Sequence, residues 1–227
     1  MIRKIFFFLL FLAFVLGVLI AFRNTLSRIV LNHVLSGTIG AETVIDSVNI
    51  GLFDPVVEIR GLKVYNPRGF INETFLEMPQ VSVGYGRKAM LGQRLHITTL
   101  TIALKELDVA INEKGLINID KLKVLHPPEN KQGPVELPKF TIDKFVLKVG
   151  RVETKNYARK GSNALVSVDF GMKERIYKNI TSFQGLAGLI LVDTMKMAGV
   201  KGAQVYGERL LDNLGKNLLK QLNAKEH

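Results

Sequence analysis

The chain has 227 residues, 47% of them hydrophobic, a formal net charge of +11 and no cysteine. This length allows one medium domain or two small ones with a sizeable core, and the lack of cysteine argues against a fold that depends on disulfides. The positive charge fits attraction to anionic lipid headgroups or an acidic partner, or a solvated Lys-rich surface. A nucleic-acid-binding protein is disfavoured because the chain has no Trp and no basic run interleaved with aromatic residues.

The N-terminal segment predicts a membrane anchor. From Ile5 to Phe22 the sequence IFFFLLFLAFVLGVLIAF contains no charged residue. As a helix it would span about 27 Å, close to the hydrocarbon thickness of a bilayer. A cleaved signal peptide is the alternative, although the segment is long for a signal and its small-x-small cleavage pattern at Leu19-Ile20-Ala21 is poor.

The charges around this segment predict its orientation. Arg3 and Lys4 precede it on a short flank, and Arg23 and Arg28 follow it. Because the positive-inside rule counts basic residues in short flanks, we expect a single pass, a cytoplasmic N-terminus and translocation of residues 23–227.

The remaining sequence predicts a mainly β protein with helices at both ends. The first helix is expected to continue to about Leu35, with Gly37 and Gly40 as a break. Val, Ile and Thr then dominate segments punctuated by Gly, Asn, Asp and Pro. Strands are predicted over residues 43–52, 56–65, 79–86, 94–104, 106–113, 139–149, 151–157, 163–171 and 175–181.

The domain boundaries follow from these changes in composition. An apolar segment begins at residue 185, and an amphipathic helix is predicted over 205–222, with a stripe of leucines opposite basic residues. We expect an anchor with a helical extension over 1–36, a β-sheet module over 37–125, a Pro-rich loop over 126–138, a continuation of the sheet over 139–184 and C-terminal helices over 185–227.

One spacing, Ile-x-x-apolar-x-apolar, recurs along the predicted strands. Because strand side chains alternate between faces, this shift of phase marks a bulge or bend. We expect such bends at Arg60-Gly61, Thr98-Thr99 and Asp143-Lys144, giving a strongly curved antiparallel sheet with a groove; an ordinary sandwich is the alternative. The spacing occurs at Ile45, Val48, Ile50; Ile59, Leu62, Val64; Ile97, Leu100, Ile102; Ile119, Leu122, Val124; and Ile142, Phe145, Leu147.

The sequence contains no recognisable catalytic or metal-binding motif. Its histidines, His33, His96, His126 and His227, lie far apart, and no HExxH, G-x-S-x-G, P-loop or G-x-G-x-x-G sequence occurs. We therefore expect a protein that is not an enzyme and that holds no cofactor and no metal.

Two stretches of the sequence resemble the N-terminal module of the AsmA family of bacterial envelope proteins. They are IGAETVIDSVNIGLFDPVVEIRGLKVYNPRGF and RLHITTLTIALKELDVAINEKGLINIDKL, and the resemblance covers about residues 1–124. It implies an inner-membrane anchor and a periplasmic, taco-shaped β-sheet with an apolar inner groove. The family is connected with phospholipid transport to, and assembly of, the outer membrane, but this chain is much shorter than its large members.

Two functions follow as expectations. The first is phospholipid handling and envelope maintenance, with phospholipid and the membrane as partners; since one short groove cannot cross a periplasm, oligomers or envelope protein partners would be needed. The second is a non-enzymatic subunit that anchors or regulates a membrane complex. The candidate groove residues are Val57, Ile59, Leu62, Val64, Ile97, Leu100 and Ile102.

Overall fold

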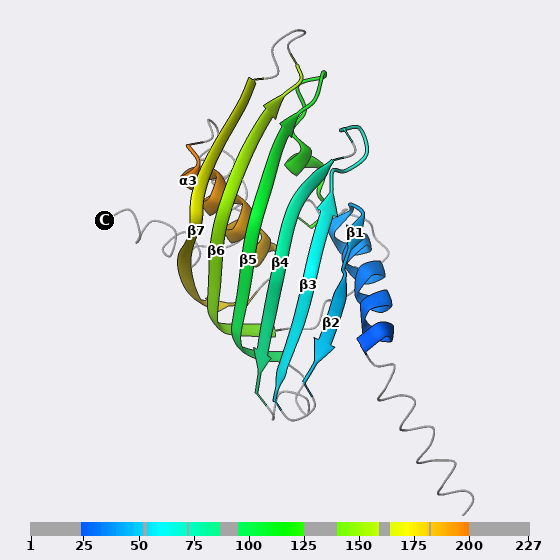
Figure 1. Ribbon diagram of the computed structural model, residues 1–227, viewed down its shortest axis with the longest axis vertical. Helices are drawn as coiled ribbons and strands as arrows, with labels where there is room; N and C mark the ends of the chain where they lie inside the picture. Colours follow the sequence, from blue (N-terminus) through cyan, green and yellow to red (C-terminus); the bar gives the residue numbers. More distant parts are fainter. Residues whose placement is uncertain are drawn as a thin grey trace, which may run out of the picture.

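The protein is mainly β, as expected, and its described part forms a single sheet with helices packed against it (Figure 1). This computed structural model describes residues 24–51, 54–71, 73–86, 95–124, 140–158, 164–181 and 183–199. The expected anchor, Ile5 to Phe22, and the expected helix over 205–222 lie outside these residues. Among the described residues, no helix is both long and apolar enough to cross a membrane.

Seven strands form the sheet in the order β1-β3-β4-β5-β6-β7, with β2 also pairing with β3. Together β1 and β2 make one interrupted edge, since both pair with β3 in the same register. The strands are β1 Thr43–Val44, β2 Ser47–Ile50, β3 Val56–Tyr65, β4 Thr74–Tyr85, β5 Leu95–Ile111, β6 Phe140–Asn156 and β7 Ala164–Ile180.

The sheet is mixed, so the prediction of an antiparallel sheet was wrong at one pair of strands. β5 and β6 run parallel, with Leu95 beside Phe140 and Ile111 beside Asn156. Parallel neighbours need a connection that returns along the length of a strand. The described start of this connection, residues 112–124, contains the short 3₁₀ helix η2, Asn118–Lys121.

Several predicted strand pairs are single long strands. The segments 94–104 and 106–113 form β5, 139–149 and 151–157 form β6, and 163–171 and 175–181 form β7. In the sequence, the change in apolar alternation and the charged residues near Lys105 predict a turn between two strands. In the structure they mark a bend inside a strand that continues.

The first bend crosses the sheet from β3 to β7. Gly61 lies opposite Pro79 with a φ of +62°, and Lys105 lies opposite Gly150. A side chain at Gly150 would place its Cβ 2.5 Å from the Lys105 carbonyl oxygen, so the two strands approach closely there. On β7 the same level carries a register shift and positive φ at Gly171 and Met172.

A second bend lies nearer the other end of the long strands. The register between β4 and β5 shifts at Gly84/Tyr85, which leaves Thr98 as the extra residue. Asp143 lies beside Thr98 on β6, and its β7 neighbour Asn179 has a φ of +57°. The expected irregularities at Arg60-Gly61, Thr98-Thr99 and Asp143-Lys144 therefore all fall inside strands.

These bends do not make the sheet strongly curled, and that expectation was wrong. Curvature accumulates when a bulge adds a residue to one strand and not to its partner. The pairs Arg60–Gln80 and Leu62–Met78 keep one register across Gly61, so no residue is added at this bend; the register of β3 and β4 shifts farther on, at Val64/Tyr65. The bend changes which side chains face the core, but it does not curl the sheet strongly.

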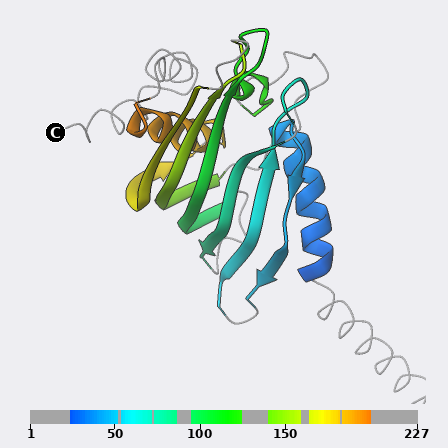
Figure 2. The same cartoon turned by 45° about the horizontal axis from the view of Figure 1, so that its top comes forward.

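Short helices cover one face of the sheet. Figure 2 shows the N-terminal helix, residues 24–39, beside β1 and β2, and the C-terminal helices against β6 and β7. The first helix continues past Gly37 and ends at Gly40, whose φ is +80°. The C-terminal elements are α2 Phe183–Gly188, the π-helical turn η3 Leu189–Asp193 and α3 Thr194–Met197.

Gly61 provides a test of the first bend. A Cβ at this position would lie 1.9 Å from Asp46 Oδ2, in addition to the strain of a side chain at a φ of +62°. We expect Gly61→Ala to lower the free energy of unfolding by about 2 kcal/mol or more, measured by denaturant titration. The control is Gly115→Ala, since Gly115 has a φ of +75° and open space around it, and should lose only about 1 kcal/mol. Equal losses would show that the contact with Asp46 is not a constraint.

Candidate functional site

The candidate site is an apolar cavity of about 200 Å³ between the sheet and the helices that cover it. Every residue around it is aliphatic, aromatic or methionine. The lining comes from the N-terminal helix (Leu35, Ile39), from β3 (Ile59, Leu62, Val64), from β4 (Phe75, Leu76, Met78, Val81), from β5 (Leu100, Ile102), from η2 and the residues after it, 118–124, which we call the η2 segment (Leu122, Val124), and from α2 and η3 (Leu186, Ala187, Ile190, Leu191).

Five of the seven predicted groove residues line this cavity: Ile59, Leu62, Val64, Leu100 and Ile102. They meet because the first bend brings Ile59 and Leu62 to the same face, where strict alternation would separate them. The other two, Val57 and Ile97, pack elsewhere in the core. Ile97 pairs with Tyr85 beyond the second bend, which separates it from the cavity.

Strand β4 supplies the part of the site that sequence reasoning missed on the sheet. Met78, Val81 and Val83 repeat the spacing of the other strands, but with Met in place of the leading Ile. Val81 pairs directly with Ile59, and Met78 with Leu62. The spacing Met-x-x-Val-x-Val could therefore have identified this wall. The contribution of α2 and η3 carries no comparable signal, because it depends on where the C-terminal segment packs.

The fourth copy of the spacing, at Ile119, Leu122 and Val124, contributes to the same core but lies outside the sheet. Ile119 and Leu122 are buried, with exposed fractions of 0% and 2%, but they lie in and just after the 3₁₀ helix η2, not in a strand. Leu122 and Val124 reach the cavity from the connection between β5 and β6. The i, i+3 spacing suits a helical turn as well as a bent strand, which explains the ambiguity.

The size and chemistry of the cavity limit what it can hold. An apolar cavity of about 150 Å³ is large enough for benzene, and without polar partners it stays dry. Pockets for whole drug-sized ligands are larger, about 300–1,000 Å³. A cavity of about 200 Å³ with an entirely apolar lining therefore suits a short stretch of hydrocarbon better than a whole lipid.

A buried hydrogen bond fixes the cover of the cavity. The Tyr177 hydroxyl on β7 donates to the carboxylate of Asp193 in η3, and Arg175 Nε lies 3.6 Å from the same carboxylate oxygen. Burial and the neighbouring Asp193 raise the pKa of Tyr177, so it remains a neutral donor. The Tyr177 ring also stacks on Phe145, with ring centroids 5.5 Å apart. These contacts hold η3, and with it Ile190 and Leu191, over the sheet.

A second buried polar group, Asp108 on β5, is the strongest candidate for chemistry in the core. Its carboxylate accepts a hydrogen bond of 2.8 Å from Lys155 Nζ, which also donates to Glu73 at 2.8 Å. Burial raises the pKa of Asp108 above its ordinary 3.8, while Lys155 opposes that rise. Burial lowers the pKa of Lys155, but hydrogen bonds to Asp108 and Glu73 outweigh it and raise the pKa overall. The group ties β5 to β6 and the start of β4.

The described residues contain no group of His, Asp and Glu side chains that could hold a metal ion. His96 and Asp143 form an exposed pair 2.8 Å apart at the second bend. Comparison with known proteins identified no relative, since no family model, curated protein or solved structure matches this chain.

The Asp108–Lys155 pair generates a prediction with a definite pH dependence. In Lys155→Met the Asp108 side chain, 1% exposed, loses its cation, and the variant should be about 3 kcal/mol less stable at pH 7. The folded-state pKa of Asp108 would then rise further above 3.8. A folded carboxyl that keeps a proton which the unfolded chain releases contributes stability at low pH and loses it as the pH rises.

Thermal unfolding at several pH values tests this prediction. The deficit of Lys155→Met should be smallest near about pH 4 and grow toward about pH 7. The matched control is Lys105→Met, because Lys105 pairs with Glu77 while remaining 51% exposed, and its deficit should be below about 1 kcal/mol. A deficit for Lys155→Met that stays constant across this range would contradict a buried, unpaired carboxyl.

Proposed function

We propose that this protein handles phospholipid at the bacterial inner membrane, holding part of an acyl chain in the cavity under its sheet. The proposal combines the likeness of residues 1–124 to the AsmA module with the uncharged segment from Ile5 to Phe22 as the anchor. In it the N-terminus is cytoplasmic and the sheet is periplasmic. The apolar groove of the module corresponds to the sheet face beneath α2, η3 and α3.

The observation that carries the proposal is the apolar cavity itself. The sheet and its helices do not close completely on each other, and they leave a partly open space of about 200 Å³ lined only by apolar side chains. Removing hydrocarbon from water contributes about 0.8 kcal/mol for each buried CH₂ group. A few carbons of an acyl chain would therefore bind there with useful affinity, because the lining offers water no polar side chain to bind.

The position of the N-terminal helix supports a role near the bilayer. This helix follows the expected anchor in the chain and places Leu35 and Ile39 in the cavity wall. From Asn24 to Leu35 a helix rises about 16 Å, at 1.5 Å per residue. The proposed site thus lies close to the membrane surface, where an acyl chain could reach it.

The cavity volume also shapes the mechanism. Since it accommodates part of one chain, most of a diacyl lipid would stay outside it, in the bilayer or in contact with another protein. The role that fits is capture or presentation of a lipid at the membrane, with oligomers or envelope partners completing any transfer.

The alternative, an interaction subunit of a membrane complex, is favoured by a different surface. Leu26, Ile29, Val30 and Val34 form an apolar stripe on the N-terminal helix and are 48–59% exposed. Their spacing places them on one face of the helix, and that face packs on none of the described core. Such a stripe could contact another membrane protein or a second copy of this chain.

Filling the cavity tests the lipid proposal. Ala187 of α2 lines the site, and Ala187→Leu adds three carbon atoms there. Binding of phospholipid to the full chain should weaken about tenfold or more. The measurement is phosphorus per protein after purification in dodecyl maltoside with extensive washing, together with thermal unfolding to verify folding.

The control is Ala103→Leu, the same change at a half-buried position on the other face of β5. Lipids around the anchor are common to all three proteins, so a difference between the two variants reports on the cavity. Equal phospholipid in both variants would contradict the lipid proposal and favour the interaction subunit.

A further inference from the structure

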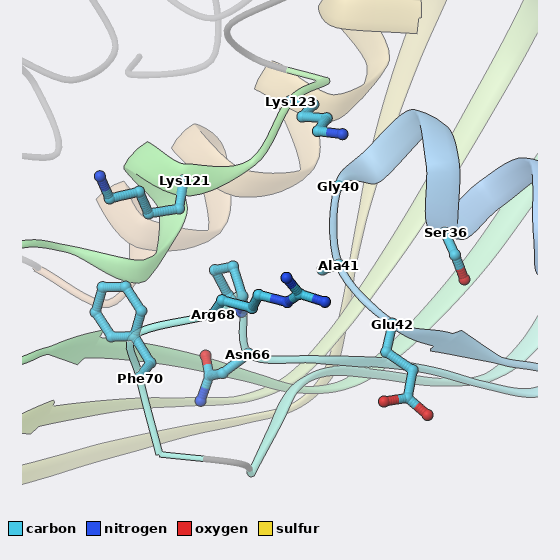
Figure 3. Close-up of a pocket in the computed structure, with 10 residues that line it drawn as sticks. Ser36, Gly40, Ala41, Glu42, Asn66, Arg68, Phe70, Lys121 and Lys123 are labelled. Atoms are coloured by element: carbon cyan, nitrogen blue, oxygen red, sulfur yellow. The ribbon is translucent and has the colours of Figure 1, made fainter.

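A second cleft, of about 820 Å³, lies beside the apolar cavity and is lined by charged, polar and apolar residues (Figure 3). It is formed by the end of the N-terminal helix, the β3–β4 loop and the η2 segment. Its charged residues are Arg68, Lys121, Lys123 and Glu42. Figure 3 shows the Arg68 guanidinium directed into the space between the helix end and the η2 segment. Both lysines extend from the η2 segment, Lys123 near this space and Lys121 away from it.

The cleft and the apolar cavity share a wall that is one backbone thick. In the η2 segment, Lys121 and Lys123 are exposed on the cleft side, whereas Leu122 and Val124 are buried on the cavity side. The helix end repeats this division: Ser36 and Gly40 line the cleft, and Leu35 and Ile39 line the cavity. A cationic and an apolar surface are thus one residue, about 3.8 Å of chain, apart.

Two contacts join the halves of this wall. The backbone N–H of Lys123 donates to the Ile39 carbonyl oxygen at 2.8 Å. A Cβ at Gly40 would lie 2.5 Å from Lys123 Cγ, so only glycine allows the lysine stem to cross there. In this wall the last turn of the N-terminal helix packs against the η2 segment.

The charges of the cleft favour an anion. Within the described part of the chain, no hydrogen bond or ion pair joins the side chains of Arg68, Lys121 or Lys123 to another residue. Three cationic side chains and one carboxylate, Glu42, therefore line the cleft. The C-terminus of the N-terminal helix adds a partial negative charge of about half a unit, which is too small to reverse the balance.

We propose that this cleft binds the phosphate of a lipid headgroup while the acyl chain of the same lipid occupies the apolar cavity. This inference rests on the proposed function. Arg68 supplies a planar fork of donors suited to two phosphate oxygens, and the lysines act as point charges on the opposite wall. The Ile39–Lys123 contact lies in the shared wall. The phosphate would lie in the cationic cleft on one side of this wall, and the acyl chain in the apolar cavity on the other.

The test measures binding of soluble phosphate compounds to the full chain in dodecyl maltoside, which contains no phosphorus. The probes are dihexanoyl phosphatidylglycerol, which has chains, and glycerol phosphate and inorganic phosphate, which have none; binding is followed by ³¹P NMR titration. We expect Lys121→Gln/Lys123→Gln to bind the short-chain lipid about tenfold more weakly. The control, Lys114→Gln/Lys173→Gln, removes the same charge at exposed positions outside the cleft and should bind like the wild type.

The outcomes separate this inference from the proposed function. Weaker binding of the lipid in both Lys121→Gln/Lys123→Gln and Ala187→Leu, with little binding of the chainless probes, supports both. Weaker binding in Ala187→Leu alone overturns the headgroup site and leaves the cavity. A third outcome is weaker binding in the lysine variant alone, with the same loss of affinity for the lipid and for inorganic phosphate. This outcome overturns the proposal of a lipid headgroup site and identifies a site for free phosphate. Equal effects of the two lysine pairs also overturn the headgroup site.

Discussion

The rest of the structure depends on the backbone at the first bend. There the alternation of side chains changes phase, so that the opposite set of positions in each strand points into the core. Gly61 accepts a positive φ, Gly150 accepts the carbonyl of Lys105, and β7 accommodates extra residues at Gly171 and Met172. Because these adjustments lie at one level across the sheet, Ile59 and Leu62 join a single apolar face with Val81 and Ile102. Without them, strict alternation would turn the apolar residues beyond the bend toward solvent, and the helices would have no continuous surface to cover.

The cavity arises where this apolar face meets a cover that does not fill it. Polar interactions hold the cover and the sheet from two sides: Tyr177 binds Asp193 of η3, and Lys155 links β6 to Asp108 on β5. The buried ion pair fixes position more than it adds stability, because desolvation of the two charges offsets much of their attraction. Buried polar contacts at the cover and an apolar space beneath it together form the arrangement that the proposed capture of hydrocarbon needs.

Much of the buried surface could be predicted from sequence, but the pairing of the strands could not. The spacing around Ile59, Ile97, Ile119 and Ile142 is local, so it identified residues that are indeed buried. Tertiary contacts decide whether such a spacing belongs to a bent strand or to a helical turn. At Ile119 it belongs to the 3₁₀ helix η2. The parallel pairing of β5 and β6 is a tertiary contact that the local pattern of neither strand encodes. The cavity depends on the packing of a C-terminal segment far away in the chain, which no local period encodes.

The most direct measurement of the central claim is photo-crosslinking with a phospholipid that carries a diazirine near the end of one acyl chain. The full chain would be reconstituted in vesicles of phosphatidylethanolamine and phosphatidylglycerol containing this lipid, irradiated, and digested for peptide mass spectrometry. Our account predicts labelled residues in the cavity wall, among them Met78 on β4 and Leu191 in η3, in addition to the segment from Ile5 to Phe22. Labelling confined to that segment would contradict it, because an acyl chain would then contact the anchor but never enter the sheet.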